Sequence, residues 1–209
     1  QIGAPLTVIN GQAQRLARRD VIGDDERTRL GRIRGEVERI VEIVRQLMEL
    51  GRQHNVEKDE LALKELIISA TDLVEEQLES HNIRLDIELP SPTPNLLANG
   101  QQIVQVLTNL LRNAAQADDV KRIRVRAQQQ DHELIIWVED DGSGIPGSHH
   151  QKVFDPFFTT KPVGQGSGLG LSMVHRIIND HGGTIGVFDS ALGGAGFEIT
   201  LPLNETAST

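Results

Sequence analysis

The sequence contains no cysteine and no tyrosine, and only 3% of its residues are aromatic. The lack of cysteine excludes disulfide bonds and cysteine-ligated metals, and it is consistent with a reducing compartment. The scarcity of aromatic side chains disfavours a surface on which nucleic-acid bases stack. Nor is there a run of about eighteen apolar residues, so we expect no segment of this chain to span a membrane.

The chain is acidic, with a formal net charge of −9 at pH 7. An acidic surface repels a phosphate backbone, so nucleic acid is not an expected partner. The chain begins at Gln1 rather than methionine, within a helical pattern and without a signal peptide. We therefore interpret it as part of a longer protein whose sensor or membrane segment would lie upstream. We expect the chain itself to be cytoplasmic and to make no membrane contact, also where the whole protein is a membrane-anchored sensor.

Apolar residues near the N-terminus recur every three or four positions, which is typical of helices in a bundle or coiled coil. Two such stretches, separated by a break at residues 20–23, predict a helical hairpin. A lone hairpin cannot bury both apolar faces, so we expect a homodimer through residues 1–53 that forms a four-helix bundle. The alternative is that the hairpin packs on the rest of its own chain. The apolar positions are Ile2, Leu6, Ile9, Ala13 and Leu16, then Leu30, Ile33, Val37, Ile40, Val44 and Leu47.

The pattern changes after a polar segment at residues 53–60, which we interpret as a linker. We predict two domains, a dimerisation hairpin at residues 1–56 and a second domain at residues 57–205. The fold class is α+β, with the hairpin followed by an α/β sandwich in which helices cover one face of a mixed sheet. Strands are expected at residues 61–63, 83–89, 123–127, 134–138, 184–189 and 197–201, and helices at residues 64–79, 99–117 and 172–181, the second capped by Asn99.

Two asparagines on one predicted helix form the first candidate cluster. Asn109 and Asn113 are four positions apart, so both amides lie on the same helix face. An amide oxygen is a hard ligand that suits Mg²⁺. The alternative is a polar stripe that bonds only to backbone or water.

The second cluster begins where an apolar strand ends, at Asp140. Gly142, Gly144 and Ile145 follow within five residues. A carboxylate beside glycines can accept a hydrogen bond from the exocyclic amine of a base without being crowded. An ordinary Asp-Asp-Gly turn would have the same composition.

Two further clusters lie towards the C-terminus. Residues 153–161 hold most of the phenylalanines in a loop, which predicts either a hydrophobic pin for a mobile segment or a small satellite core. Residues 164–172 are rich in glycine and lead into a helix, whose N-terminus favours an anion that the backbone N–H groups can approach. Their spacing matches neither the dinucleotide-binding fingerprint nor a P-loop. A flexible hinge is the alternative for this segment.

In this order, the four clusters resemble the N, G1, F and G2 boxes of sensor histidine kinases of two-component systems. The matching segments are residues 109–117, 140–145, 154–161 and 166–171, and residues 182–183 and 193–197 resemble the family's closing glycine region. The resemblance covers nearly the whole chain and implies a Bergerat ATP-binding fold. The Pro-Phe-Phe-Thr-Thr-Lys form of residues 156–161 is similar to that of the nitrogen-regulation and dicarboxylate-sensing kinases.

The resemblance also implies roles for individual residues. Asp140 would accept a hydrogen bond from the adenine amine, and Asn113 would hold Mg²⁺ with Asn109 beside it. The glycines at 166, 168 and 170 would form a lid over the phosphates. The expected ATP-binding residues are Asn109, Asn113, Asp140, Gly142, Gly144, Ile145, Lys161, Gly166, Ser167, Gly168, Leu169, Gly170 and Leu171.

The first six residues, Gln-Ile-Gly-Ala-Pro-Leu, resemble the family's H box. The phospho-accepting histidine would then stand immediately before Gln1, and Gln1 would occupy the position of the family's acid. Gln1, Asn109 and Asn113 are thus the expected catalytic positions, although an amide at Gln1 cannot act as a base. Ala4 replaces a polar residue that positions water for dephosphorylation in the family, and Gln116 stands where many relatives carry lysine.

The implied activity is ATP-dependent phosphorylation of that histidine, followed by transfer to an aspartate on a response-regulator receiver domain. Two alternatives remain open. One is a pseudokinase scaffold that binds nucleotide and partners only, which Gln1 and Ala4 favour. The other is a different ATPase of the same superfamily, such as a chaperone or a mismatch-repair clamp, which the N-terminal hairpin and the phenylalanine loop disfavour.

The histidines of the chain show no metal-binding spacing, and most are predicted to be solvated on loops and helix surfaces. They are His54, His81, His132, His149, His150, His175 and His181.

Overall fold

The structure is a computed structural model of the 209-residue chain. It divides into two compact units, which are described separately: residues 1–54 with 159–169, and residues 55–158 with 170–209. The predicted positions Gln1, Ala4 and Gly166 lie outside the described residues. None of the described helices is long and apolar enough to cross a membrane. The described residues are Gly23, Asp25, Glu26, residues 28–33, Val37, Ile40, residues 57–161 and residues 167–203.

In the first unit, the described residues from Asp25 to Ile40 are helical. Near the helix start, Oε2 of Glu26 accepts a hydrogen bond at 2.8 Å from the backbone N–H of Gly23. A glutamate that reaches back three residues satisfies one of the donors that a helix start leaves without a partner. One turn further on, Arg29 forms an exposed ion pair with Asp25.

Four of the predicted apolar positions of this helix are described, and Leu30 among them is partly buried. Val37 is buried, whereas Ile33 and Ile40 are 47% and 42% exposed. The three residues share one helix face because they are four and three positions apart. The helical hairpin as a whole, its dimerisation and the domain boundary at residue 56 stay predictions.

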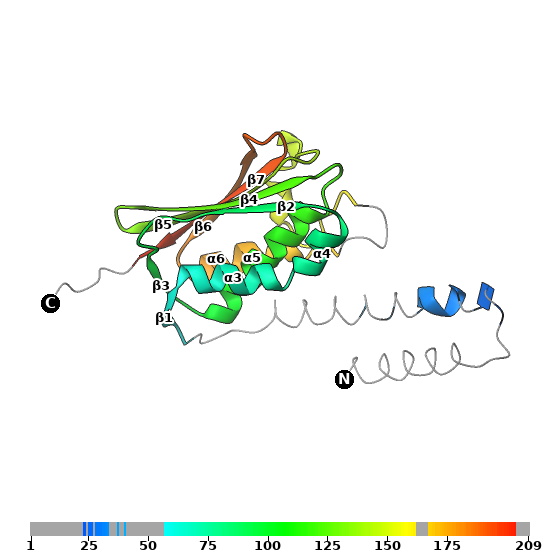
Figure 1. The fold of residues 1–209 in the computed structure, drawn as a ribbon, viewed down its shortest axis with the longest axis horizontal. Helices are drawn as coiled ribbons and strands as arrows, with labels where there is room; N and C mark the ends of the chain where they lie inside the picture. The colour runs from blue at the N-terminus through cyan, green and yellow to red at the C-terminus, as the bar shows by residue number, and fades with distance from the viewer. Residues whose placement is uncertain are drawn as a thin grey trace. The chain divides into compact units, whose positions relative to one another are not determined.

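The second unit combines a five-stranded sheet, in the order β2-β4-β5-β7-β6, with a two-stranded sheet of β1 and β3. In the larger sheet β2 runs parallel to β4 and the other neighbours are antiparallel. Helices α3, α5 and α6 lie on one face of it (Figure 1). The predicted sandwich with a mixed sheet is therefore confirmed. The elements are β1 (Asp59–Ala62), α3 (Leu63–Asp72), α4 (Glu75–Ser80), β2 (Arg84–Glu88), β3 (Asn95–Ala98), α5 (Gly100–Ala115), β4 (Arg122–Gln130), β5 (Glu133–Asp140), η1 (Gly147–His149), η2 (Lys152–Phe154), α6 (Gly170–Asp180), β6 (Thr184–Asp189) and β7 (Ala195–Pro202).

One local prediction was wrong, and one strand was missed. The helix predicted over residues 64–79 is interrupted between α3 and α4, where the N–H of Val74 bonds to the carbonyl of Thr71. The apolar period continues through this turn, so the pattern alone does not reveal the break. Strand β3 was not among the predicted strands. It forms because β1, more than thirty residues earlier, pairs with it in antiparallel register.

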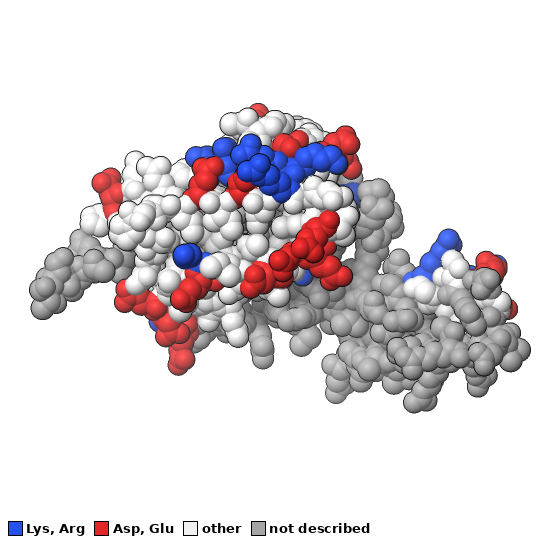
Figure 2. All heavy atoms as spheres, in the orientation of Figure 1, with Lys and Arg blue, Asp and Glu red and all other residues white. Residues whose placement is uncertain are grey.

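The sheet face opposite the helices carries a group of basic side chains along β2 and β4 (Figure 2). Arg84 and Arg122 lie side by side in the parallel register. Both donate through Nε to Asp86, at 2.8 and 2.6 Å. The hydrogen bond from Arg122 is the main cause that holds the pKa of Asp86 below its ordinary value, against the effect of burial. The basic side chains are thus partly neutralised by an acid within the same face.

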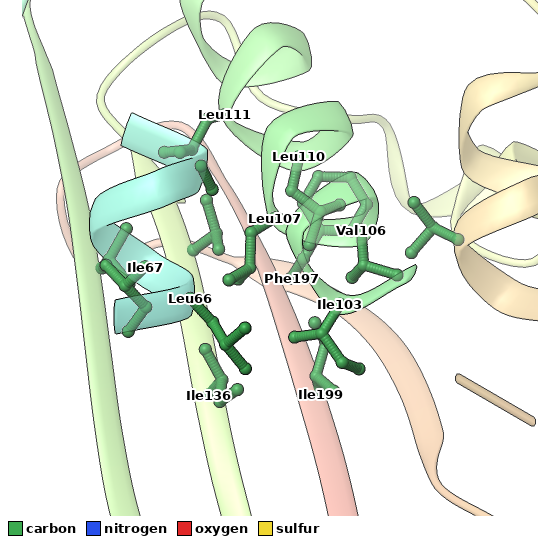
Figure 3. Packing of buried hydrophobic residues seen from close by; sticks show 14 of the residues in the cluster. Leu66, Ile67, Ile103, Val106, Leu107, Leu110, Leu111, Ile136, Phe197 and Ile199 are labelled. Atoms are coloured by element: carbon green, nitrogen blue, oxygen red, sulfur yellow. The ribbon is translucent and has the colours of Figure 1, made fainter. Parts of the chain in front are cut away.

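The hydrophobic core lies between the sheet and the helices, with α5 at its centre (Figure 3). The apolar side chains of α5 recur at helical spacing, and each fully buried one contributes about 1.5–3 kcal/mol of transfer free energy. Asn99 caps this helix as predicted, because its Oδ1 accepts a hydrogen bond from the N–H of Gln102 at 3.0 Å. The opposite, polar face of α5 is left for other contacts. The core residues labelled in the figure are Leu66, Ile67, Ile103, Val106, Leu107, Leu110, Leu111, Ile136, Phe197 and Ile199.

His181 is an exception among the histidines, most of which were expected to be solvated, because its side chain is buried. Its Nδ1 lies 2.8 Å from the carbonyl oxygen of Ile177, and its Nε2 accepts a hydrogen bond from the N–H of Asn99 at 3.1 Å. Burial is the main cause that lowers the pKa of His181. The neutral ring therefore ties the end of α6 to the start of α5.

Candidate functional site

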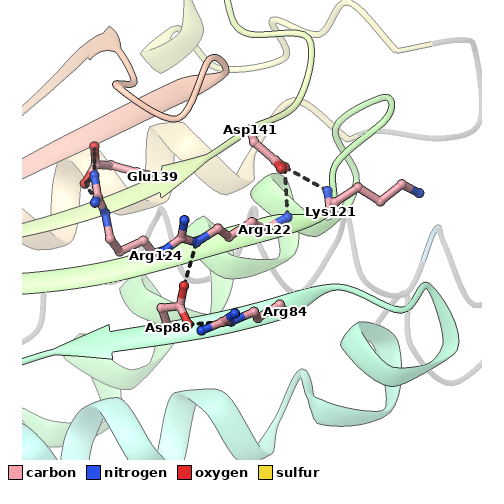
Figure 4. Close-up of polar contacts among 7 residues, drawn as sticks. All are labelled: Arg84, Asp86, Lys121, Arg122, Arg124, Glu139 and Asp141. Carbon is pink, nitrogen blue, oxygen red and sulfur yellow. Dashed lines mark hydrogen bonds and ion pairs between the residues drawn. The ribbon is translucent and has the colours of Figure 1, made fainter.

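Three consecutive acidic residues stand at the end of β5, which closes with Asp140, and the first of them, Glu139, is buried within the open face of the sheet. Arg126 donates to Oε2 of Glu139 at 2.8 Å, and Arg124 bonds to both carboxylate oxygens at 3.1 and 3.2 Å (Figure 4 shows the Arg124 pair). Burial raises the pKa of Glu139, but the two arginines outweigh it and hold that pKa below its ordinary value. The two guanidinium groups compensate the charge of the carboxylate, so Glu139 is a structural residue of the sheet.

The third acid, Asp141, forms hydrogen bonds with the start of β4. Its Oδ1 accepts hydrogen bonds from the backbone N–H groups of Lys121 and Arg122 at 2.7 and 2.8 Å (Figure 4). This carboxylate therefore acts like the acid of a turn, as the alternative interpretation of this segment expected. Asp140, the residue before it, has different surroundings.

Asp140 is only 3% exposed and lies on the helix-covered side of the sheet. Its Oδ1 accepts hydrogen bonds from the backbone N–H groups of Gly142 at 2.9 Å and Ala195 at 3.1 Å. Among the described residues, no group donates to Oδ2. Burial is the main cause that raises the pKa of Asp140; the two N–H groups oppose it and Asp141 adds to it. One carboxylate oxygen is fixed, and the other is available to a donor on a ligand.

The turn between β6 and β7 completes the surroundings of Asp140. The N–H of Gly194 donates to the Asp140 carbonyl at 3.2 Å, and a Cβ at position 194 would collide with Oδ1 of Asp140 and the backbone nitrogen of Gly142. Gly144, with a φ of +73°, packs against the backbone of Gly194. Gly194 and Ala195 were not among the predicted site residues. The only signal in the sequence was the glycine run at positions 193–196.

The predicted amide pair lies on α5 as expected. Asn109 and Asn113 are both partly buried, and within the described part of the chain neither side chain makes a hydrogen bond. Neither amide therefore bonds to the described backbone, and the part of the alternative that concerns water stays open. A Cβ at Gly170 would lie 3.5 Å from Oδ1 of Asn109, so the start of α6 passes beside this amide.

The loop after Asp140 approaches the same helix near its end. A Cβ at Gly142 would lie 2.7 Å from Cβ of Ala117 and 3.1 Å from the carbonyl oxygen of Asp118. Ala117 lies two residues beyond Ala115, the last residue of α5. The fold thus brings the G1 segment to the end of α5 and the start of α6 beside Asn109. Their individual roles stay predictions.

The donor set fits a magnesium ion that is shared with a nucleotide. Groups of three or more His, Asp or Glu residues that could hold a metal are absent from the described residues. Mg²⁺ is usually bound by one or two protein oxygens and completes its shell with water and phosphate oxygens. The free amide oxygens of Asn109 and Asn113 suit that arrangement better than a site made of protein ligands alone.

The remaining predicted binding residues are divided between the two units. In the first unit, the Lys161 N–H bonds to Oγ1 of Thr159 at 3.2 Å, and the Leu169 N–H bonds to Oγ of Ser167 at 3.3 Å. Gly168 has a φ of +66°, which suits glycine. Gly170 and Leu171 belong to the second unit, where they begin α6.

The phenylalanines of the predicted F segment have different surroundings. Phe154 packs against the core, and its ring centroid is 5.5 Å from that of His175. Phe158 contacts the His149 ring edge-on at 5.3 Å. Phe157 is 62% exposed and has a φ of +68°, a backbone conformation that side chains rarely adopt. The segment therefore contains one ring that packs against the main core and one exposed ring.

Residues 98–205, which contain Asp140 and both asparagines, match the family of histidine kinase-, DNA gyrase B-, and HSP90-like ATPases. The match covers more than half of the chain. The chain belongs to this family. The family match therefore places Asp140, Asn109 and Asn113 within an ATPase domain.

Similar curated proteins are sensor kinases. The chain is 33% identical to the sensor histidine kinase ZraS of Escherichia coli K12 over 207 residues, which are 99% of this chain and 44% of ZraS. It is 34% identical to the signal transduction histidine-protein kinase AtoS of the same strain, over 98% of this chain and 33% of AtoS. The chain thus spans less than half the length of these relatives.

Solved structures of the histidine kinase ThkA are similar as well. Its nucleotide-free catalytic domain is 35% identical, with a TM-score of 0.65 over 70% of this chain and 96% of that domain. ThkA in complex with the response regulator TrrA is 29% identical, with a TM-score of 0.75 over 96% of this chain and 58% of that chain. The closer likeness to nitrogen-regulation and dicarboxylate-sensing kinases stays a prediction.

Proposed function

We propose that this chain is the catalytic core of a sensor histidine kinase, which binds Mg-ATP and phosphorylates a histidine immediately before Gln1. The observation that carries the proposal is the buried Asp140, whose Oδ1 is fixed by two backbone N–H groups while Oδ2 has no described donor. Such a carboxylate is suited to accept a hydrogen bond from the amine of adenine.

In the proposed site, the residues of α5 hold the phosphate end of the nucleotide. Asn113, with Asn109 beside it, places an amide oxygen on Mg²⁺, which neutralises charge on the phosphates. The glycines at 166, 168 and 170 would supply backbone N–H groups to the phosphates. Lys161 adds a cation. Catalysis by these residues consists mainly of positioning and of electrostatic stabilisation.

The transfer itself forms a P–N bond to the imidazole as the bond between the β- and γ-phosphates breaks, with ADP as the leaving group. The proton of the imidazole nitrogen passes to solvent, because the amide of Gln1 has no basic lone pair to receive it. A second transfer moves the phosphoryl group to an aspartate on a receiver domain. ThkA has been solved in complex with a response regulator, which supports a partner of this class.

We propose that the protein works as a cytoplasmic homodimer through residues 1–53. Ile33 and Ile40 expose 47% and 42% of their surface on the same helix face as Val37. A second copy of the same helix would cover them, because a two-fold axis presents the same apolar stripe to itself.

Incorporation of radiolabel from γ-labelled ATP tests the function. The present chain should bind Mg-ATP but incorporate no acid-labile phosphate, whereas a chain extended upstream should be labelled if histidine precedes Gln1. In that extended chain Gln1→Glu should speed labelling by about tenfold to a hundredfold, since a carboxylate can accept the imidazole proton.

Three results would contradict parts of this proposal. Acid-labile label on the present chain would show that another histidine is the acceptor. An extended chain that holds ATP and a histidine but is not labelled would favour a nucleotide-binding scaffold without kinase activity. Asn113→Ala should remove the magnesium dependence of ATP binding, and unchanged dependence would contradict the role of that amide.

A further inference from the structure

His150 spans the loop that follows Asp140. Its Nε2 lies 2.9 Å from the carbonyl oxygen of Ile145 and 3.9 Å from Oδ1 of Asp189. A carbonyl and a carboxylate both accept hydrogen bonds, so Nε2 carries the hydrogen and donates it to Ile145. The side chain is only 25% exposed.

The hydrogen bond closes a short loop that contains η1. Inside this loop, the N–H of His149 bonds to the carbonyl of Pro146 at 2.8 Å. Ile145 itself lies beyond the end of β5 and outside the sheet ladder. The direction of the Ile145 carbonyl therefore depends on the imidazole of His150 rather than on a neighbouring strand.

The second neighbour of the imidazole, Asp189, ends β6 and belongs to the hairpin that surrounds Asp140. In the register of the sheet, Asp189 is opposite Ala195. The N–H of Ala195 is one of the two donors to Oδ1 of Asp140. His150 thus lies between the loop after Asp140 and the hairpin that fixes Asp140.

We propose that His150 is a positioning residue for the adenine end of the nucleotide site, acting through its hydrogen bond to Ile145. That bond holds residues 142–145 in the conformation in which Oδ2 of Asp140 meets the base. The inference rests on the proposed nucleotide site. A net hydrogen bond is worth about 1 kcal/mol, which corresponds to roughly a fivefold change in affinity.

The test compares His150→Leu, which keeps the bulk but removes the donor, with His150→Gln, whose amide N–H can reach the same carbonyl. His132→Leu is the matched control, because His132 is exposed in the β4–β5 turn at the other end of β5. Calorimetric titration with ATP and with GTP measures affinity and base preference, and thermal melting measures stability.

His150→Leu should bind ATP about fivefold more weakly and prefer ATP over GTP less, while His150→Gln and His132→Leu stay close to the unmodified chain. A merely structural role would lower the melting temperature and the fraction of active protein without changing the ratio of ATP to GTP affinity. Wild-type affinity and preference in the leucine variant would overturn the proposal, as would a glutamine variant no better than leucine.

Nitrogen-15 chemical shifts of the His150 ring give an independent readout that needs no substitution. They should show a hydrogen on Nε2, and a ring that carries its hydrogen on Nδ1 alone would exclude the bond to Ile145. This readout tests the hydrogen bond to Ile145 also if the leucine variant does not fold. If the unmodified chain binds no ATP, the proposed function fails, and this result is separate from any difference among the variants.

Discussion

Glu139 and Asp140 are consecutive residues of β5, and their carboxylates lie on opposite faces of the sheet. Glu139 is paired in register with Arg124 on the open face, whereas Asp140 is opposite Ile123, a fully buried core residue. Two guanidinium groups compensate Glu139, and two backbone N–H groups hold Asp140. We therefore expect Glu139 to determine stability and Asp140 to determine binding.

Replacement of Glu139 by glutamine should destabilise the fold without abolishing ATP binding. The change leaves two arginines without their buried anion, so the free energy of unfolding should fall by about 2–3 kcal/mol. Because the pKa of Glu139 is held below its ordinary 4.5, this contribution is present above pH 4.5 and is lost as the pH falls further. Urea unfolding followed by the fluorescence of Trp137, the only tryptophan, measures it. Equal stability of the two proteins at pH 7 would contradict the assignment.

Asp140→Asn should show the opposite behaviour. The asparagine keeps an oxygen for the N–H groups of Gly142 and Ala195 but offers an amide where a ligand donor needs an acceptor, so ATP affinity should fall about tenfold or more. Burial raises the pKa of Asp140, so its ionised form costs folding free energy at neutral pH, and the asparagine variant should melt at the same temperature or higher. Calorimetry that finds equal ATP affinity would show that Asp140 does not contact the adenine amine.

Gly194→Ala should weaken nucleotide binding although position 194 lies outside the G1 segment. The added methyl group would collide with Oδ1 of Asp140, so the carboxylate or the hairpin has to move. Gly186→Ala is the control, because a Cβ there meets no atom within 4 Å. We expect at least a tenfold loss of ATP affinity for the first variant, of the size of a lost charged hydrogen bond, and none for the second. Similar titration curves for both variants would refute the close approach of the hairpin to Asp140.

The proposed dimer can be separated from nucleotide binding. Ile33 and Ile40 are exposed on one helix face, so Ile33→Asp with Ile40→Asp places two charges in the expected interface. Light scattering should find a dimer for the unmodified chain and a monomer for the double variant, with ATP affinity unchanged. A monomer for the unmodified chain would contradict the predicted four-helix bundle.

The stability of the second unit should decrease in mild acid because of His181. The Nε2 of His181 accepts a hydrogen bond from the N–H of Asn99. Protonation of the ring would place a second hydrogen against that N–H. Of the nearby charges, Lys58 opposes protonation and Asp180 favours it. The pKa of His181 is lowered from 6.5, so the folded state binds fewer protons and stability falls as the pH drops below 6.5, by at most about 1.4 kcal/mol per pH unit. His181→Gln should flatten this dependence, and His132→Gln, at an exposed position, should not. Urea unfolding between pH 7.5 and 5.5 measures the change of unfolding free energy with pH. An equal change in His181→Gln and in the unmodified chain would disprove the role of His181.

The candidate site illustrates how far local patterns reach. The spacing of Asn109 and Asn113 predicts a shared helix face, and the apolar run before Asp140 predicts a strand that ends there. The structure confirms both placements, because each depends on the helical or strand repeat alone. Gly194, Ala195 and His150 were missed, because each meets the site through a contact that no repeat along the chain encodes.

The sequence by itself determined the fold class, the helix and strand periods around the core, and the order of the clusters that relate this chain to histidine kinase-like ATPases. Those features follow from side-chain type and local spacing, since amphipathic repeats have to bury one face. The tertiary structure decided that Asp140 is held by the β6–β7 hairpin, that β3 pairs with β1, and that His181 is buried between two helices. These outcomes depend on partners distant in sequence, because burial and hydrogen bonding are settled only when the sheet and its helices come together.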